Sequence, residues 1–341
     1  MTRTFWAPGR VNLIGEHTDY SGGLVLPVAL ELGVRIDGDT ADRLELTSDV
    51  FGAANPADGW GRYVAAVEAE LDALGRPPVG FRGRVTSNLP VGAGLSSSAA
   101  LDVAVATTLC AVADFELEPM AVALAAQRAE HRAVGVPCGI MDQAASVLGR
   151  AGHAILLDTA SLEYRLVPLP PGLALVIVDS GVRRRLEESG YAQRRRELER
   201  AVPVLRGTPP ADVAAADAAD LPPRLRHVVT ENDRVRRTVT ALEQGDAAQL
   251  GAIFREGHES LRRDFEVSTP ELDLLVDLAY DAGAAAARMT GGGFGGSIVA
   301  LVDVDGAQAT ADAIVATYTE RTGIEAAAHV TRAADGAREL G

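Results

Sequence analysis

Residues 90–100 read Pro-Val-Gly-Ala-Gly-Leu-Ser-Ser-Ser-Ala-Ala and lead directly into an apolar run that ends near Val112. The glycines let the backbone turn its amide groups inward, and the serines place hydroxyl groups where a helix begins. The first N–H groups of a helix are unpaired and carry a partial positive charge, so they can bind phosphate. Serines in this position can equally be plain helix caps. The candidate phosphate-binding residues are Gly92, Ala93, Gly94, Leu95, Ser96, Ser97 and Ser98, with the helix expected from Ser98.

Strand-like and helix-like segments alternate on both sides of this loop. Helices are expected at Gly61–Leu74, Pro119–Ala133, Asp142–Leu148, Gln193–Leu205, Val228–Glu243, Ala247–Ser260, Pro270–Ala287 and Gln308–Thr322. Strands are expected at Val25–Ile36, Arg43–Leu46, Phe81–Thr86, His153–Asp158, Leu173–Asp179, Ser297–Val304 and Ala326–Thr331. A proline- and glycine-containing segment, Pro168–Gly172, marks the expected domain boundary. The order of elements after this boundary predicts an α+β second domain.

The composition excludes several classes of protein. The 341 residues suffice for two domains, and the 32 basic against 47 acidic residues give a net charge of −15. This balance argues against a nucleic-acid or anionic-membrane partner, because both require a basic surface. Every basic residue apart from histidine is arginine. The chain therefore lacks the lysine of a Walker A loop, of a protein kinase and of an enzyme that forms an imine.

Cysteine usage and hydropathy predict a cytoplasmic protein. The two cysteines, Cys110 and Cys138, lie in an apolar run and in a turn, a spacing that indicates neither a disulfide framework nor a zinc site. The first residues contain no hydrophobic signal core, and no apolar stretch approaches the ~18 residues of a membrane helix.

A second glycine-rich segment, Gly291-Gly-Gly-Phe-Gly-Gly296, follows a helical pattern and precedes a strand. The dinucleotide-binding fingerprint requires the opposite order, strand, glycines and helix, so that interpretation fails. Five glycines around one phenylalanine predict a backbone that approaches a ligand or another loop very closely, although a tight structural turn is an alternative.

A third segment concentrates polar groups. Residues 7–20 read Ala-Pro-Gly-Arg-Val-Asn-Leu-Ile-Gly-Glu-His-Thr-Asp-Tyr, between apolar neighbours. Carboxylates accept hydrogen bonds and an imidazole can donate one, so Glu16, His17 and Asp19 suit a polyhydroxylated ligand.

These segments together resemble one family. Residues 7–20 resemble the signature of galactokinases, and residues 90–100 resemble the nucleotide loop of the wider GHMP kinase superfamily. Residues 129–143 resemble the galactokinase catalytic segment, and residues 288–296 resemble the third motif of the superfamily. Weaker similarity at residues 180–196, 260–273 and 333–340 extends the resemblance over almost the whole chain.

The resemblance implies a two-domain α+β GHMP kinase fold: an N-terminal α/β domain (residues 1–170), a ferredoxin-like C-terminal domain (residues 171–341) and an active site between them. It implies transfer of the γ-phosphate of ATP to the anomeric hydroxyl of α-D-galactose, with Mg²⁺, by a protein favoured to be a monomer. By position in the motifs, Asp142 and Arg10 match the catalytic pair, and Ser98 and Glu130 match the magnesium ligands. Sugar contacts are expected from Glu16, His17, Asp19, Gly139 and Tyr191, and adenine contacts from Trp60 and Tyr63.

Several alternatives stay open at this stage. A helix start and a nearby arginine would stabilise the ionised carboxylate of Asp142, so it could remove a proton late or act by positioning. Arg183–Arg185 could be surface charges or could contribute to the field at the nucleotide site. The same fold could also act on another hexose, an amino sugar or a pentose, or bind sugar without catalysis. A mevalonate- or homoserine-type activity fits residues 7–20 less well.

Overall fold

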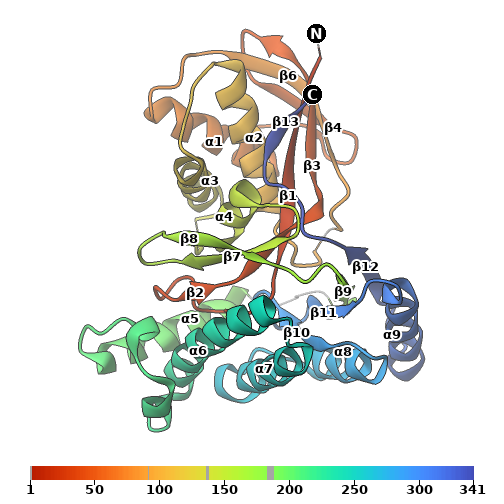
Figure 1. The fold of residues 1–341 in the computed structure, drawn as a ribbon. Helices are drawn as coiled ribbons and strands as arrows, with labels where there is room; N and C mark the ends of the chain where they lie inside the picture. The colour runs from red at the N-terminus through yellow and green to blue at the C-terminus, as the bar shows by residue number, and fades with distance from the viewer. Residues whose placement is uncertain (1, 91, 136–137, 183–187) are drawn as a thin grey trace.

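The computed structural model describes residues 2–90, 92–135, 138–182 and 188–341. It has two parts stacked one above the other, with both chain ends at the top of the N-terminal part (Figure 1). Each part combines helices with its own sheet, and the expected two-domain α+β fold is confirmed.

The N-terminal part is built on a sheet of six strands. Its order is β13 (Arg338–Leu340), β1 (Arg3–Asn12), β3 (Pro27–Ala41), β6 (Gly80–Ser87), β4 (Glu45–Ser48) and β5 (Gly52–Ala53). The register of β1 on β3 shifts between Pro8 and Arg10. Such an irregularity redirects the side chains that follow it. The irregularity lies directly before Arg10, within the polar segment of residues 7–20.

Four helices accompany this sheet: α1 (Gly61–Ala73), α2 (Ser97–Val112), α3 (Pro119–Val134) and α4 (Met141–Leu148). Helix α2 is buried along most of its length because its residues are apolar on every side. A small sheet of β2 (Leu24–Val25), β7 (His153–Asp158) and β8 (Tyr164–Pro168) lies below α4, beside the C-terminal part (Figure 1).

The C-terminal part contains an antiparallel sheet in the order β10 (Ala286–Thr290), β11 (Ser297–Asp303), β9 (Leu173–Asp179) and β12 (Ala327–Thr331). Its helices are α5 (Glu188–Ala201), α6 (Pro223–Gln244), α7 (Ala247–Ser260), α8 (Pro270–Asp281) and α9 (Ala307–Thr322). Along β9, Leu175 and Ile177 belong to one hydrophobic core, while Val176 and Val178 belong to another. The sheet is therefore buried on both faces, in the strand order of a ferredoxin-like domain.

Short turns connect the remaining segments. Three single-turn 3₁₀ segments, Val202–Leu205, Pro210–Asp212 and Ala215–Ala218, lie between α5 and α6. A π-helical turn, Leu261–Phe265, extends α7 directly.

Most expected elements are observed, and the differences have local causes. The helix expected over Pro270–Ala287 ends at Asp281, because Gly283 adopts a positive φ of 91° and the chain then enters β10. Strands β1, β8 and β13 were not expected. Strand β13 pairs with β1, so the last residues of the chain complete the first sheet. The domain boundary expected at residue 170 stays a prediction.

Candidate active site

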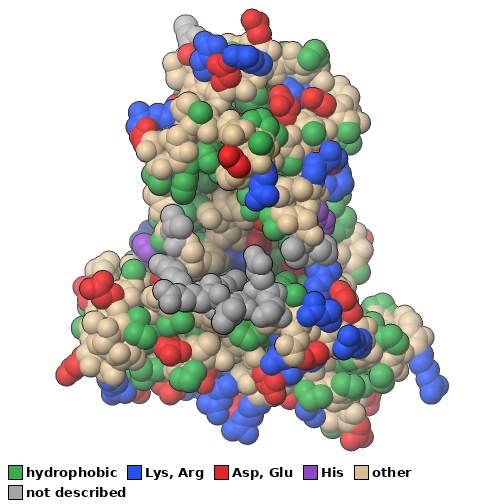
Figure 2. All heavy atoms as spheres, turned by 180° about the vertical axis from the view of Figure 1, so that it is seen from behind, with side chains coloured by type: hydrophobic (Ala, Val, Ile, Leu, Met, Phe, Trp, Pro, Cys, Tyr) green, Lys and Arg blue, Asp and Glu red, His purple; other side chains and the backbone are tan. Residues whose placement is uncertain are grey.

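A cavity of about 640 Å³ lies between the two parts of the molecule. Seen from behind, the surface is hollowed at this level (Figure 2). Of the residues predicted to form the site, the cavity is lined by Arg10, Glu16, His17, Asp19, Gly92, Gly94, Leu95, Ser96, Ser97, Ser98, Glu130, Gly139, Asp142 and Tyr191. Segments from the beginning, middle and second half of the chain therefore meet at one place.

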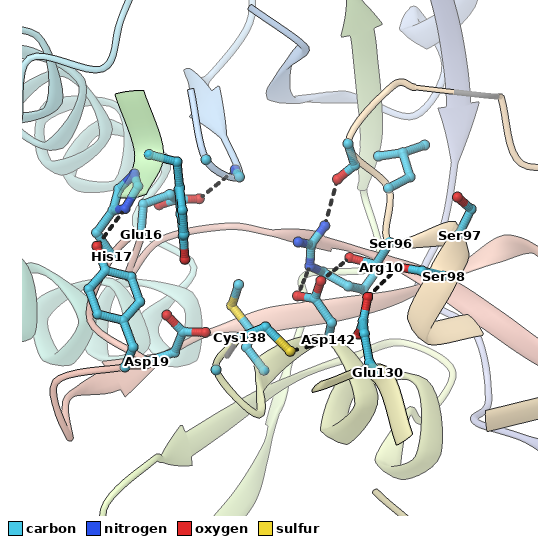
Figure 3. A pocket seen from close by; sticks show the side chains of 18 of the residues that line it. Arg10, Glu16, His17, Asp19, Ser96, Ser97, Ser98, Glu130, Cys138 and Asp142 are labelled. Atoms are coloured by element: carbon cyan, nitrogen blue, oxygen red, sulfur yellow. Dashed lines mark hydrogen bonds and ion pairs between the residues drawn. The ribbon is translucent and has the colours of Figure 1, made fainter. Parts of the chain in front are cut away.

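Asp142 is held by two donors at the centre of this cavity. The Nε of Arg10 lies 2.8 Å from its Oδ1, and the hydroxyl of Ser96 donates to its Oδ2 (Figure 3). Asp142 also lies in the first turn of α4, where the helix dipole stabilises a negative charge. The Nη1 of Arg10 donates to the carbonyl of Gly94 at 2.7 Å, which ties the pair to the glycine–serine loop. The predicted Arg10–Asp142 pair is therefore brought together in the structure.

Ser98 and Glu130 form a second oxygen-rich pair beside Asp142. The hydroxyl of Ser98 donates to Oε1 of Glu130 at 2.6 Å, and the amide of Gln143 donates to Oε2. Burial raises the pKa of Glu130, while the Ser98 hydrogen bond opposes that shift. A hydroxyl and a carboxylate in contact, at the edge of a phosphate-sized space, fit the preference of Mg²⁺ for oxygen ligands. Among the described residues, no group of three or more His, Cys, Asp and Glu side chains forms a complete metal-binding cluster.

The glycine–serine loop does not cap its helix with serine side chains. Ser96 precedes α2 with a left-handed φ of 57° and makes no capping hydrogen bond. Its hydroxyl and that of Ser98 instead face the two carboxylates just described. The plain-cap interpretation is therefore wrong for these side chains, and the free amide groups at the start of α2 face the cavity with Ser97.

The second glycine-rich segment packs against this loop. Gly291 and Gly292 line the cavity, and the hydroxyl of Ser297 donates to the carbonyl of Ala93 at 2.7 Å. A Cβ on Gly293, whose φ is 76°, would lie 2.4 Å from the carbonyl oxygen of Val267. The predicted close approach of this backbone to another loop is confirmed.

At the other end of the cavity lie Glu16, His17 and Asp19 (Figure 3), and the ring of Tyr191 lies beside His17 with centroids 5.7 Å apart. The ring of His17 stacks on Phe265 with centroids 4.3 Å apart, and its Nδ1 lies 2.9 Å from the hydroxyl of Tyr20. Gly139 approaches so closely that a Cβ there would lie 1.7 Å from Oδ2 of Asp19. The carboxylate of Asp19 can therefore occupy its observed position only because residue 139 is a glycine.

The carboxylates at this end are poorly solvated. Burial raises the pKa of Glu16 to about 7, although Arg288 opposes the shift. Burial and the neighbouring charge of Asp142 raise the pKa of Asp19 to about 6, against the opposing charge of Arg10. Both groups consequently ionise near neutral pH. A change in their surroundings can therefore shift each carboxyl group between its neutral and its ionised form.

Three predicted nucleotide-site residues do not line the cavity. Trp60 and Tyr63 pack at the start of α1 against the hydrophobic core, and the side chain of Ala93 is buried. The buried Nε1 of Trp60 has no hydrogen-bond partner among the described residues. Arg183–Arg185 lie outside the described residues.

Sequence reasoning assigned no role to two side chains that support the site. Arg288 contacts Glu16, and Phe265 stacks on His17. The glycine-rich third motif includes Arg288, but only its position in a buried strand shows that it points at Glu16. Phe265 is positioned by a π-helical turn, which leaves no clear signal in sequence.

Known proteins with this fold and site belong to one superfamily. The models of the GHMP kinases N terminal domain and the GHMP kinases C terminal domain match residues 62–150 and 238–320, and the galactokinase galactose-binding signature matches residues 2–37. A mevalonate kinase structure, 18% identical, shares the fold with a TM-score of 0.70 over 97% of this chain and 99% of its own. The fold and the site thus define the chain as a GHMP kinase.

Closer relatives identify the family. A galactokinase from Chloroflexus aggregans is 44% identical, covering 94% of this chain and 89% of the relative, and one from Pyrococcus furiosus is 39% identical, covering 98% of both. The crystal structure of Lactococcus lactis galactokinase in complex with galactose is 31% identical and superimposes with a TM-score of 0.93 over 99% of this chain and 95% of that one. The chain belongs to the galactokinase family, and it is a sugar kinase.

Proposed function

We propose that the protein transfers the γ-phosphate of ATP to the anomeric hydroxyl of α-D-galactose, giving galactose 1-phosphate and ADP. One observation carries the proposal: the same cavity holds the Arg10–Asp142 pair, the amide-rich start of α2 and a cluster of buried carboxylates suited to a sugar. The relatives named above are galactokinases, and one is solved with galactose. A mevalonate-type substrate has fewer hydroxyl groups than a hexose and carries a carboxylate of its own, which the carboxylates of this site would repel.

Asp142 orients the sugar hydroxyl and receives its proton late in the reaction. The Nε of Arg10 donates to one of its oxygens and the hydroxyl of Ser96 to the other, which fixes the orientation of the carboxylate. In a loose transition state the hydroxyl becomes acidic only as the new P–O bond forms. Arg10, whose side chain is 7% exposed, is fixed beside the transferring group and offsets negative charge there.

The phosphates of ATP bind the backbone amides that precede and begin α2. Gly92 and Gly94 have positive φ angles of 78° and 75°, which a side chain would oppose. Gly291 and Gly292 bring a second stretch of backbone to the same region. The unpartnered indole N–H of Trp60 supports a nucleotide base nearby, since a buried donor without an acceptor is unfavourable.

Ser98 and Glu130 hold Mg²⁺, which neutralises charge on the phosphates when it is bound. Cys138 contributes nothing as a nucleophile, because burial and neighbouring carboxylates raise the pKa of its thiol far above the usual range. The sugar occupies the end of the cavity formed by Glu16, His17 and Asp19, with Gly139 and Tyr191 completing it.

A substrate panel tests the proposal. Purified protein is incubated with ATP, Mg²⁺ and galactose, glucose, galactosamine, N-acetylgalactosamine or arabinose, ADP is measured by a coupled assay, and the phosphorylated carbon is located by NMR. We expect galactose to give the highest kcat/KM and phosphate on C1. Galactose binding without ADP release would indicate a sugar sensor, and preference for another sugar would overturn the substrate assignment.

The proposal includes a monomeric enzyme of the cytoplasm. Among the described residues, no helix is both long and apolar enough to cross a bilayer. Gel filtration with light scattering tests the oligomeric state, and cell fractionation tests the compartment.

A further inference from the structure

Arg288 lies at the centre of a buried charge network behind the sugar end of the cavity. It occupies the middle of β10, and its side chain is fully buried. Its Nη2 lies 2.7 Å from Oε2 of Glu16 and 2.7 Å from Oε1 of Glu231. Glu16 lines the cavity, whereas Arg288 does not. One guanidinium group therefore joins a ligand-facing carboxylate to a carboxylate of the C-terminal part.

The far side of the network is firmly anchored. Glu231, on α6, accepts hydrogen bonds from the backbone N–H of Gly15 at 3.0 Å and from Nε of Arg234 at 2.7 Å. Arg288 and Arg234 lower the pKa of Glu231 far below its usual range, although burial opposes them. Glu231 is thus a permanent negative charge that fixes the guanidinium of Arg288.

A glycine leaves the space that the guanidinium occupies. A Cβ on Gly257, in α7, would lie 2.6 Å from Nη1 of Arg288. Glycine inside a helix is less favourable than alanine by about 1 kcal/mol, so its presence here indicates a packing requirement. Gly257 of α7 thus leaves space for the guanidinium group, and Glu231 of α6 is its counter-charge. Arg288 itself lies on β10.

We propose that Arg288 is a positioning residue for the sugar site, which holds the carboxylate of Glu16 in the orientation that receives a sugar hydroxyl. The inference rests on the proposed function. Without Arg288, burial would favour the neutral form of Glu16, and its carboxyl group would lose one of the contacts that fix its orientation. The network also touches the segment proposed to lie near the phosphates, because the backbone N–H of Gly291 donates to Oε1 of Glu16 at 3.4 Å.

Two sets of variants test whether Arg288 positions Glu16, so the conclusion does not depend on the folding of any single variant. In Gly257→Ala, all charges remain and the helix gains propensity, but the new methyl group displaces the guanidinium. Gly306→Ala is the control glycine substitution, because its φ is −102° and a Cβ there would meet no atom within 4 Å. We expect Gly257→Ala to raise the galactose KM by about tenfold, the factor for one hydrogen bond to a charged group. The ATP KM and the galactose KM of the control should change little.

The second test separates positioning from charge balance. Arg288→Met removes the cation, and Arg288→Met with Glu231→Gln removes one charge of each sign. If Arg288 only balances charge, the double variant will regain both Tm and galactose KM. We expect it to regain Tm while the galactose KM stays high.

Kinetics with monodeoxygalactoses provide the final readout. In wild type, removing the hydroxyl that Glu16 binds should lower kcat/KM strongly, and in Gly257→Ala that particular penalty should shrink while the others persist. An equal loss for every sugar, or an unchanged galactose KM, would overturn the positioning role. Failure of wild type to phosphorylate galactose would instead refute the proposed function, so the two failures are distinguishable.

Discussion

Substitution of Gly139 by alanine tests how the sugar end of the cavity is built. The backbone at Gly139 does not have a positive φ, so alanine introduces no conformational strain there. Its methyl group, however, would lie 1.7 Å from Oδ2 and 2.2 Å from Cγ of Asp19. To restore even a 3.0 Å contact the carboxylate oxygen must retreat by about 1.3 Å, the difference between 3.0 and 1.7 Å. A hydrogen bond from a sugar hydroxyl to Asp19 would not survive that movement.

The magnitude follows from the lost interaction. A hydrogen bond to a charged group contributes about 1.5–3 kcal/mol, which corresponds to a factor of roughly 10–100 in affinity. We therefore expect the galactose KM of Gly139→Ala to rise by about that factor, with the ATP KM nearly unchanged. Steady-state kinetics with coupled ADP detection, varying each substrate in turn, measure both values.

A double variant identifies the cause. In Asp19→Ala with Gly139→Ala the contacts with Oδ2 and Cγ are removed and only the 2.9 Å approach of the two Cβ atoms is left, so the double variant should behave much like Asp19→Ala alone, with a Tm above that of Gly139→Ala. Strong non-additivity is expected because the two residues are in direct contact. Additive losses in the double variant, or a wild-type galactose KM in Gly139→Ala, would refute the reasoning.

Four further predictions follow from the same geometry. Asp142→Asn should lower kcat by about 10²-fold or more with a smaller change in galactose KM, as measured by steady-state kinetics; near-normal turnover would exclude a chemical role. Glu130→Gln should raise the Mg²⁺ concentration needed for half-maximal rate, and an unchanged Mg²⁺ titration would place the metal elsewhere. Gly94→Val forces a β-branched residue to a φ of 75°, so the ATP KM should rise by about tenfold or more while the galactose KM changes far less in the same assay. Asp19 has a pKa of about 6 in the folded chain against an ordinary value of 3.8, so the folded state binds the extra proton in this window and stability from this group falls as pH rises through it. Asp19→Asn should remove that component from the pH dependence of Tm, and an identical slope in the variant would contradict the assignment.

The local parts of the site could be predicted from sequence, whereas the long-range contacts could not. The glycine–serine loop before α2 is a continuous segment whose chemistry follows from the start of a helix. The direction of its hydroxyl groups depends on the left-handed Ser96 and on carboxylates from α3 and α4. Asp142 and Arg10 are 132 residues apart, and only the family resemblance suggested that they meet.

The strands that were not expected from the sequence all lack a clear alternation of apolar and polar residues. Strand β1 is buried on both faces over most of its length and carries an irregularity, so its residues do not alternate between apolar and polar. Strands β8 and β13 are short and largely exposed, which leaves little hydrophobic signal. The overextended helix after Pro270 arises because the alanines at 284–287 favour a helix locally, whereas tertiary burial places Ala286 and Ala287 in β10, a fully buried edge strand that pairs with β11.

The charges that line the cavity suggest how its two substrates are accommodated. Among its described lining residues, four carboxylates, Glu16, Asp19, Glu130 and Asp142, face a single guanidinium, that of Arg10, and Arg10 is already paired with Asp142. Burial raises the pKa of the first three, so each of them carries a negative charge less readily than an exposed carboxyl group would. A triphosphate adds further negative charge, and the described lining supplies no lysine and no second arginine to offset it. Backbone amides provide only partial charges, so we infer that the nucleotide enters together with a divalent cation held at Ser98 and Glu130. The neutral sugar carries no such requirement, and its proposed site can therefore be built from carboxylates, of which Glu16 is paired from behind with Arg288.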